Sequence, residues 1–345
     1  MTLSRQGIII TQTPSRISFF GGGTDFPDYF NQFGGTVIGA AIDKYVYVTI
    51  NSLERFFEKR IRLSYSKHEF VDRPEELEHP VVRCILQTHT HFDERDFLDI
   101  HTFADLPAAS GIGSSSSFSV GMLNALYLLR GIYKTPESIA KEAIWVEREK
   151  LKEAGGWQDQ ILAAYGGLTR VHFSNDSFRV EPICIPLDKK QALQDSLIMV
   201  FIGGVRSSAQ IQEKAMDLND PMKIGYLQQI QAYAQEAFEM LTSDLSADKL
   251  IKEFGALLHR AWLAKRQLSK NISSQTIDQL YERALQAGAL GGKLCGAGGG
   301  GFLLLVVPKE KRLAVQQAFE GYKCLDLKFE DHGSKVIYSK GSDKL

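Results

Sequence analysis

The chain has 345 residues, of which 44% are hydrophobic and 23% are charged, and its formal net charge at pH 7 is −1. A chain of this size can bury one large core or two moderate ones, and we expect two domains. The balanced charge lacks the broad positive field that nucleic acid or an anionic membrane surface requires, so neither is expected as a partner. No apolar run reaches the length of about 18 residues that a membrane helix needs.

The four cysteines lie far apart in the sequence and show no spacing typical of metal ligands. The N-terminal residues MTLSRQGIIITQ lack the apolar segment of a signal peptide. We therefore expect a reduced protein with a cytoplasmic location. Both a monomer and a homodimer are compatible with the sequence.

The first part of the chain alternates short β-rich runs with loops. Residues 7–12, 16–20 and 41–50 are rich in β-branched and aromatic side chains, and they predict strands. Lys44 interrupts the apolar face of the third run.

Residues 107–120 read PAASGIGSSSSFSV, and an apolar helix predicted over residues 115–129 follows directly. A flexible Gly/Ser linker is the alternative interpretation, but such a linker would have polar flanks, which are missing here. Gly111 and Gly113 allow backbone conformations closed to other residues, and the serines after them begin the helix with outward-pointing N–H groups. We therefore expect a phosphate site at this helix start. Neither the GxxxxGK[ST] loop nor a dinucleotide fingerprint is present.

A second helix is predicted to begin at Thr135, an N-cap residue followed by Pro136, and to end at Ala154 before two glycines. Glu147 falls on its apolar stripe. One interpretation is a position at the rim of the core, where the carboxylate reaches water. The other follows from Asp159, a second acid close behind: two carboxylates near a phosphate loop suggest a metal ligand and a base.

The second half of the chain contains strands on both sides of a long helical block, which is predicted over residues 207–287. This order indicates an α+β fold rather than a doubly wound parallel sheet. A short helix is expected at residues 313–319, and strands are expected at residues 168–173, 178–185, 197–204, 302–307, 324–329 and 335–339.

Three glycine-rich segments stand far apart in the chain: PSRISFFGGGTDFPDYF at 14–30, LPAASGIGSSSS at 106–117 and GGKLCGAGGGGF at 291–302. In this order they resemble the three signature motifs of the superfamily of galactokinase, homoserine kinase, mevalonate kinase and phosphomevalonate kinase, known as the GHMP kinases. Within it, GGGTD and GGWQDQ resemble the D-glycero-D-manno-heptose 7-phosphate kinases, with fucokinases as near relatives.

The resemblance implies a two-domain GHMP kinase fold with the active site between the domains. It implies an N-terminal domain over residues 1–190, similar to the second domain of ribosomal protein S5 and carrying the ATP phosphate loop. It also implies a ferredoxin-like C-terminal domain over residues 191–345. ATP and Mg²⁺ are the expected cofactors, and a small-molecule sugar phosphate is the expected partner.

The motifs also carry residue roles. The resemblance implies that Asp159 faces the acceptor hydroxyl beside Arg16, and that Ser115 and Glu147 hold the metal. The residues expected at the ATP phosphates are Ala109, Ser110, Gly111, Ile112, Gly113, Ser114, Ser115 and Ser116. The residues expected at the substrate are Gly22, Gly23, Thr24, Asp25, Gly156, Arg206, Gly296, Gly298 and Gly299.

Several of these roles have plain alternatives. Asp159 either accepts the proton of the attacking hydroxyl or only orients it. Alternatively, Arg16 has only a structural role and pairs with a surface acid. Asp25 also suits a turn or N-cap, and Gly298 a tight turn beside a strand.

A terminal phosphate on the acceptor requires a cation of its own. Arg206 precedes a predicted helix, and its bidentate fork fits a phosphate group. Lys44 and Lys293 are rival candidates for binding this phosphate. For each of the three residues, the alternative is a side chain that is simply exposed to solvent.

The function that follows from the resemblance is an ATP-dependent sugar kinase acting on the anomeric hydroxyl of a heptose 7-phosphate. Its product, the 1,7-bisphosphate, would feed the synthesis of nucleotide-activated heptose. A kinase of fucose or another free sugar is one alternative. A sensor that binds nucleotide and sugar without turnover is another.

Overall fold

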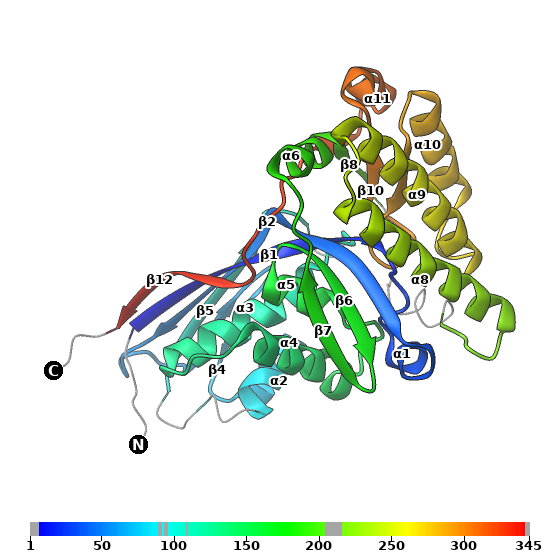
Figure 1. Ribbon diagram of the computed structural model, residues 1–345. Coiled ribbons are helices and arrows are strands. Elements are labelled where there is room, and N and C mark those ends of the chain that lie inside the picture. The colour runs from blue at the N-terminus through cyan, green and yellow to red at the C-terminus, as the bar shows by residue number, and fades with distance from the viewer. Residues whose placement is uncertain (1–6, 89–91, 93–95, 108–109, 204–215, 342–345) are drawn as a thin grey trace.

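The computed structural model describes residues 7–88, 92, 96–107, 110–203 and 216–341, and Ala109 and Arg206 lie outside the described residues. Two sheets organise the described chain, one of eight strands and one of four. The eight-stranded sheet is formed mainly by the N-terminal half and the four-stranded sheet by the C-terminal half. The expected α+β fold with two domains is therefore confirmed (Figure 1).

Two long antiparallel strands, β1 (Gly7–Phe20) and β2 (Gly35–Ser52), run through the larger sheet. The predicted runs 7–12 and 16–20 are parts of the single strand β1. The register between the strands shifts after Pro14, so that Asp43 and Lys44 of β2 have no register partners in β1. This bulge explains why Lys44 breaks the apolar alternation of β2.

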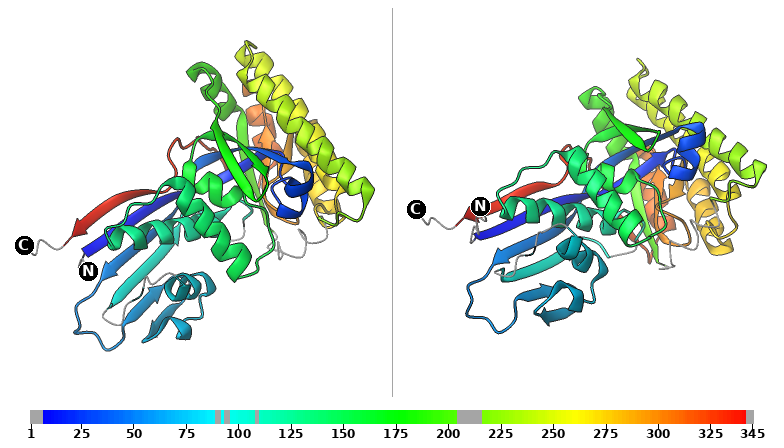
Figure 2. Two further views of the ribbon diagram at one scale, coloured as in Figure 1. Left: turned by 60° about the horizontal axis from the view of Figure 1, so that its bottom comes forward. Right: turned by 90° about the horizontal axis from the view of Figure 1, so that it is seen from below.

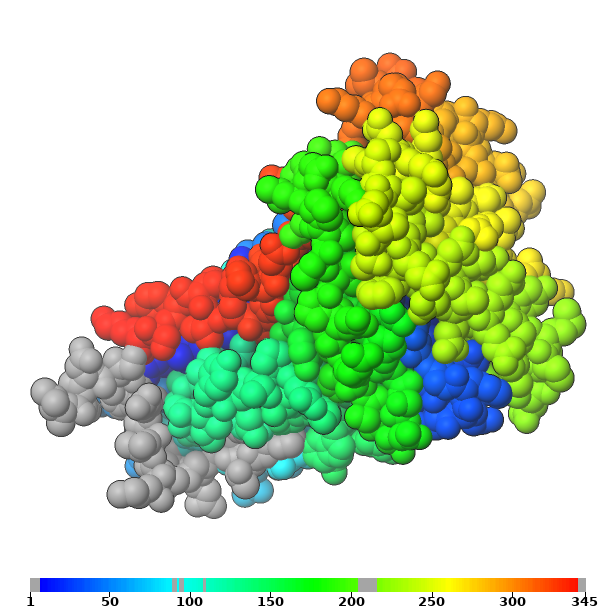
Figure 3. Space-filling view, viewed as in Figure 1, coloured from blue at the N-terminus to red at the C-terminus, as the bar shows by residue number. Residues whose placement is uncertain are grey.

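The remaining strands extend the larger sheet on both sides of this pair, in the order β12-β1-β2-β5-β3-β4, and the β6–β7 hairpin pairs with the other end of β2. The C-terminal strand β12 departs from the expected domain division, because it returns to pair with β1 (red in Figure 3). The bounds are β3 (Ile61–Ser64), β4 (His68–Val71), β5 (Leu98–Ala104), β6 (Leu168–Ser174), β7 (Ser177–Pro182) and β12 (Lys335–Gly341).

Helix α3 (Ser114–Leu129) packs against β1 and β2 and is buried on nearly every side, as its apolar sequence predicts. Thr135 caps α4 (Pro136–Ile144), and its side chain accepts a hydrogen bond from the Ser138 N–H, as expected. The predicted end at Ala154 is wrong, because the helix continues as a π-helical segment, η2 (Trp145–Lys150), and stops there. The other helices of this half are α1 (Pro27–Phe33), η1 (Pro74–Glu76), α2 (Pro80–Thr88) and α5 (Gln158–Tyr165).

The smaller sheet is antiparallel and has the strand order β11-β8-β10-β9. Helices α8, α9 and α10 gather around it, at the end of the molecule away from both termini (Figures 1 and 2). None of the described helices combines the length and the apolar character needed to cross a membrane. The bounds are α6 (Leu187–Ser196), β8 (Leu197–Gly203), α8 (Pro221–Thr242), α9 (Ala247–Gln267), α10 (Gln275–Gln286), β9 (Gly291–Leu294), β10 (Gly301–Val306), η3 (Lys309–Lys311), α11 (Arg312–Ala318) and β11 (Lys323–Leu325).

Candidate active site

A cavity lies where the two sheets and their helices meet, and its lining is drawn from both halves of the chain. Arg16 of β1, Asp25 of the following loop and Asp159 of α5 come from the N-terminal half. Lys265 of α9 and Lys293 of β9 come from the C-terminal half. The cavity therefore brings together all three glycine-rich motifs, because Gly22, Gly23 and Gly296 line it and Gly111 bonds to Arg16 at its edge.

The loop before α3 has the backbone conformation that its glycines predict. Gly111 and Gly113 have φ values of 83° and 75°. A Cβ on Gly111 would lie 2.6 Å from the carbonyl oxygen of Cys295, so the close approach of the third motif also requires glycine here. Gly113 itself occupies the N-cap position, and no side chain caps the helix. The first N–H groups of α3 are thus left for an anion.

The other residues of this loop have distinct environments. Ser110 is buried, and its hydroxyl has no hydrogen-bond partner among the described residues. The Ile112 side chain lies in the core, while its carbonyl accepts a hydrogen bond from the Arg16 N–H at 2.9 Å. Ser114 is half-buried and Ser115 is exposed at the start of the helix. Ile112 can therefore contribute backbone atoms alone to a phosphate site.

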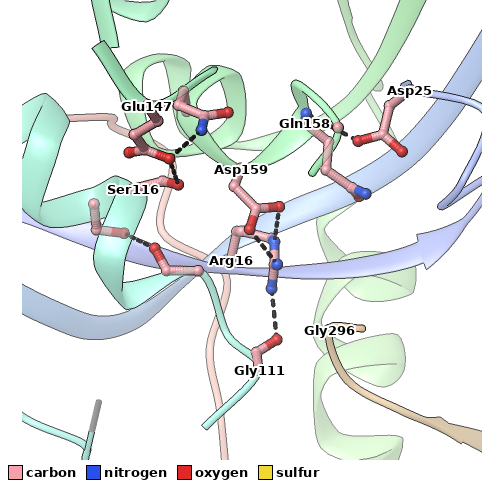
Figure 4. Close-up of polar contacts among 12 residues, drawn as sticks. Arg16, Asp25, Gly111, Ser116, Glu147, Gln158, Asp159 and Gly296 are labelled. Atoms are coloured by element: carbon pink, nitrogen blue, oxygen red, sulfur yellow. Dashed lines mark hydrogen bonds and ion pairs between the residues drawn. The ribbon is translucent and has the colours of Figure 1, made fainter. Parts of the chain in front are cut away.

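Arg16 and Asp159, which both line the cavity, form a bidentate ion pair (Figure 4). The Arg16 Nε and Nη2 atoms donate to the two carboxylate oxygens at 2.8 and 2.6 Å, and Nη1 donates to the Gly111 carbonyl at 2.8 Å. Burial alone would lower the pKa of Arg16, but the Asp159 carboxylate raises it. A surface role for Arg16 is wrong, because its side chain is 5% exposed. The arginine links the candidate acid to the phosphate loop.

Asp25 is fully buried and connects the first motif to α5. Its Oδ1 accepts from the Gly23 N–H at 2.9 Å, and its Oδ2 accepts from the Gln158 N–H at 3.2 Å. Burial raises the pKa of this carboxyl group. Asp25 thus serves the local turn and caps α5, while it also lines the cavity.

Not every residue expected at the substrate reaches the cavity. The Thr24 hydroxyl is buried and donates to the carbonyls of Gly21 and Thr36, so it holds the turn instead. Gly298 and Gly299 are also absent from the lining. A Cβ on Gly298 would lie 2.7 Å from the Ile272 carbonyl oxygen, and the Gly299 N–H donates to the same oxygen at 3.0 Å. These two glycines support the tight-turn alternative.

Glu147 lies inside the protein, since it is 1% exposed, and the rim interpretation is wrong. Its Oε2 accepts hydrogen bonds from the Ser116 hydroxyl at 2.9 Å and the Gln160 amide at 2.5 Å (Figure 4). Its Oε1 has no hydrogen-bond partner among the described residues. The serine in contact with Glu147 is thus Ser116, whereas Ser115, the serine expected at the metal, is exposed at the start of α3. Burial raises the pKa of Glu147.

The residues around Glu147 fit a magnesium ion bound together with a nucleotide. A buried carboxylate oxygen without a partner, next to a serine hydroxyl, offers the hard oxygen ligands that Mg²⁺ prefers. Within the described ranges, no group of three or more His, Cys, Asp and Glu residues could hold a metal. Glu147 and Ser116 would therefore supply the protein ligands, with phosphate oxygens and water completing the shell. When bound, Mg²⁺ neutralises phosphate charge.

Sequence reasoning missed two charged residues of the cavity, Arg148 and Lys265. Lys265 lies on the amphipathic helix α9, outside all three motifs, and its Nζ donates to the Gly296 carbonyl at 2.7 Å. Of the candidates for a terminal phosphate, Lys293 lines the cavity. Lys44 does not, and it pairs with the neighbouring Asp43 at 2.8 Å.

Comparison with known proteins supports the resemblance of the motifs. The GHMP kinase N-terminal domain matches residues 79–167, and the GHMP kinase C-terminal domain matches residues 244–323. A D-glycero-alpha-D-manno-heptose 7-phosphate kinase of Campylobacter jejuni is 30% identical over 95% of this chain and 98% of that protein. The chain belongs to the GHMP kinase family. The expectation of a kinase is therefore confirmed at the level of the family.

This GHMP kinase is also similar to a bifunctional fucokinase and to a kinase of known structure. A bifunctional fucokinase/GDP-fucose pyrophosphorylase of Arabidopsis thaliana is 25% identical over 92% of this chain, which spans 32% of that protein. A crystal structure described as a D-glycero-D-manno-heptose 1-phosphate kinase of Bacteroides thetaiotaomicron has a TM-score of 0.76 and 24% identity. The match covers 96% of this chain and 99% of that one. This likeness supports the GHMP kinase fold.

Proposed function

We propose that this kinase transfers the γ-phosphoryl group of ATP to the anomeric hydroxyl of D-glycero-D-manno-heptose 7-phosphate, giving the 1,7-bisphosphate. The single observation that carries the proposal is the Arg16–Asp159 pair, which is joined through Arg16 to the carbonyl of Gly111 in the phosphate loop. The similarity to the Campylobacter heptose 7-phosphate kinase over nearly the whole chain supports the choice of sugar. The product suits the synthesis of nucleotide-activated heptose.

The residues have complementary roles in this proposal. Phosphoryl transfer requires the protein mainly to position two partners and to stabilise charge on the transferred group. Asp159 contacts the attacking hydroxyl, either as base or as orienter, while Arg16 fixes the carboxylate. The N–H groups at the start of α3 bind phosphate oxygens. Asp25, in the same motif as Arg16, faces the sugar hydroxyls.

The proposal is tested by incubating the purified protein with ATP, Mg²⁺ and one sugar at a time. Heptose 7-phosphate should be turned over much faster than the same heptose without its phosphate, and the product should carry phosphate at C1. Equal turnover of the unphosphorylated heptose would remove the substrate assignment. Binding of nucleotide and sugar without any turnover would indicate a sensor.

A kinase of fucose or another free sugar is the second candidate, favoured by the likeness to the Arabidopsis fucokinase. Such a kinase needs no cation for a terminal phosphate. Preferred turnover of fucose over heptose 7-phosphate in the same assay would establish it.

Substituting Gly156 by alanine should disturb the acceptor side of the site. A Cβ at this position would lie 1.9 Å from the Asp25 Oδ2, so the carboxylate or the start of α5 must move. We expect kcat/KM for the acceptor to fall by about 10²-fold, the loss that a misplacement of about 1 Å produces. The measurement is a steady-state titration of the acceptor at saturating ATP.

Gly225→Ala is the matched control for this substitution. Gly225 lies on α8, and a Cβ there would meet nothing within 4 Å. We expect unchanged kinetics and a gain in stability of about 0.5–1 kcal/mol, because alanine favours the helix. Wild-type kinetics in Gly156→Ala would show that the contact between Gly156 and Asp25 is unimportant for the acceptor.

A further inference from the structure

Two lysines in the cavity have no role in the proposed transfer step. Lys265 and Lys293 come from different elements, α9 and β9, and both line the cavity that contains Arg16 and Asp159. Lys293 is buried, at 5% exposure, and Lys265 is half-buried. A lysine is seldom buried without a partner of opposite charge, so their position requires a reason.

The contacts of the two lysines orient them without neutralising them. The Lys293 Nζ donates to the carbonyls of Ser18 and Phe19 at 2.7 and 3.1 Å, and the Lys265 Nζ donates to the Gly296 carbonyl at 2.7 Å. Neither ammonium group forms an ion pair with a carboxylate within the described part of the chain. Since each ammonium has three N–H donors, three of the six remain for a ligand.

The lining of the cavity, as far as the structure describes it, carries an excess of positive charge. Its described residues include the cations Arg16, Arg148, Lys265 and Lys293 but only two carboxylates, Asp25 and Asp159. The guanidinium of Arg16 is committed to Asp159. That of Arg148 donates to the Gly156 carbonyl at 3.0 Å and lies 3.6 Å from Glu147. The uncommitted charge therefore resides on the two lysines.

The electrostatics of the two lysines favour an anionic ligand. Burial lowers the pKa of Lys265 to about 8. It also lowers the pKa of Lys293 well below its ordinary value, and the nearby Lys265 lowers it further. Holding two like charges close together and away from water destabilises the unliganded protein. A ligand with two negative charges would offset this cost.

We propose that Lys265 and Lys293 bind the terminal phosphate of the acceptor and thereby select a sugar phosphate over a free sugar. This inference rests on the proposed function, in which the acceptor carries such a phosphate. A phosphate dianion matches the two positive charges, and its oxygens accept the three free N–H donors. Asp159 and the lysines line the same cavity, so one acceptor can reach both.

The test combines removal of a lysine with removal of the substrate phosphate. Lys265→Met keeps a long side chain and deletes the charge. We expect its kcat/KM for heptose 7-phosphate to fall by about 10- to 100-fold, the range of charge-assisted hydrogen bonds. Its kcat/KM for the unphosphorylated heptose should stay within about threefold of wild type. Lys293→Met is the second variant, with the same expectation.

Lys252→Met is the matched control, because Lys252 is exposed on the same helix as Lys265. It should leave both sugars unaffected. Thermal unfolding of each variant verifies folding, and Lys265→Met should unfold at a higher temperature than the unliganded wild type, because a half-buried charge close to Lys293 is gone. An equal loss with both sugars, or a higher KM for ATP with an unchanged preference between the sugars, would overturn the inference. The second result would assign the lysines to the nucleotide phosphates.

Failure of the inference and failure of the proposed function give different results. If wild type prefers heptose 7-phosphate and both lysine variants keep that preference, the inference is wrong and the function stands. If wild type turns over neither heptose, the function is wrong, and calorimetric titration with heptose 7-phosphate tests the lysines directly. If wild type binds heptose 7-phosphate and Lys265→Met does not, the proposed role of the lysines is supported. If wild type does not bind it, that role is overturned.

Discussion

Replacing Asp159 by asparagine should lower kcat by about 10²- to 10⁴-fold, the contribution of a positioned acid or base in proton transfer. The substitution preserves the shape of the side chain but removes the charge that faces Arg16 at 2.6 Å. Nucleotide affinity should change little, because the phosphate loop keeps its backbone conformation. Steady-state kinetics and a separate nucleotide-binding titration measure the two effects.

The Asp159 prediction has a control at an equivalent helix position. Asp159 is the second residue of α5, and Asp248 is the second residue of α9. Because Asp248 is exposed, Asp248→Asn removes a charge from a helix start without touching the cavity. It should leave kcat unchanged. An Asp159→Asn variant with wild-type kcat would show that this carboxylate is not catalytic.

Comparing Asp159→Asn with Asp159→Ala separates the two roles left open for this residue. An asparagine oxygen can still accept a hydrogen bond from the acceptor hydroxyl, whereas alanine cannot. If Asp159 only orients the hydroxyl, the asparagine variant should keep much of the rate that the alanine variant loses. If Asp159 accepts the proton, both variants should be similarly slow.

Replacing Glu147 by glutamine should raise the magnesium concentration that the reaction needs. Glutamine fills the same space beside Ser116 but lacks the negative charge. We expect kcat to fall by about 10²-fold at limiting Mg²⁺, because a metal contributes several kcal/mol of charge stabilisation when it is held in place. The measurement is a titration of the rate with Mg²⁺ at fixed ATP, together with nucleotide binding without metal, which should be unchanged.

The same substitution should stabilise the metal-free protein at neutral pH. Burial raises the pKa of Glu147 above its usual value of 4.5, so ionisation of this group opposes folding as the pH rises through the raised pKa. Glutamine removes that cost, and the difference in free energy of unfolding between the variant and wild type should grow with pH above about 4.5. Glu149→Gln, at an exposed position in the same π-helical segment, is the control and should show no such trend. A destabilised Glu147→Gln at neutral pH would contradict this account of the buried carboxylate.

The sequence alone determined the elements whose local chemistry is distinctive. Gly111 and Gly113 have the positive φ values that their place before a helix predicts, because non-glycine residues rarely adopt this conformation. Thr135 caps α4 because its hydroxyl can accept a hydrogen bond from the first turn. Arg16 and Asp159 were paired through the resemblance of their motifs, and the structure places them in direct contact.

The tertiary structure decided the features that depend on residues far apart in the chain. Periodicity placed Glu147 on an apolar stripe, but its burial depends on how η2 packs, and the π-helical turn is invisible to a 3.6-residue period. Lys265 sits in an amphipathic helix without any motif, so its place in the cavity follows from the docking of α9 on β9. The pairing of β12 with β1 links residues more than 300 positions apart, and no local pattern specifies such a partner. Local sequence fixes backbone conformation and capping, whereas burial, charge pairing and long-range strand partners are set by which surfaces meet when the whole chain packs.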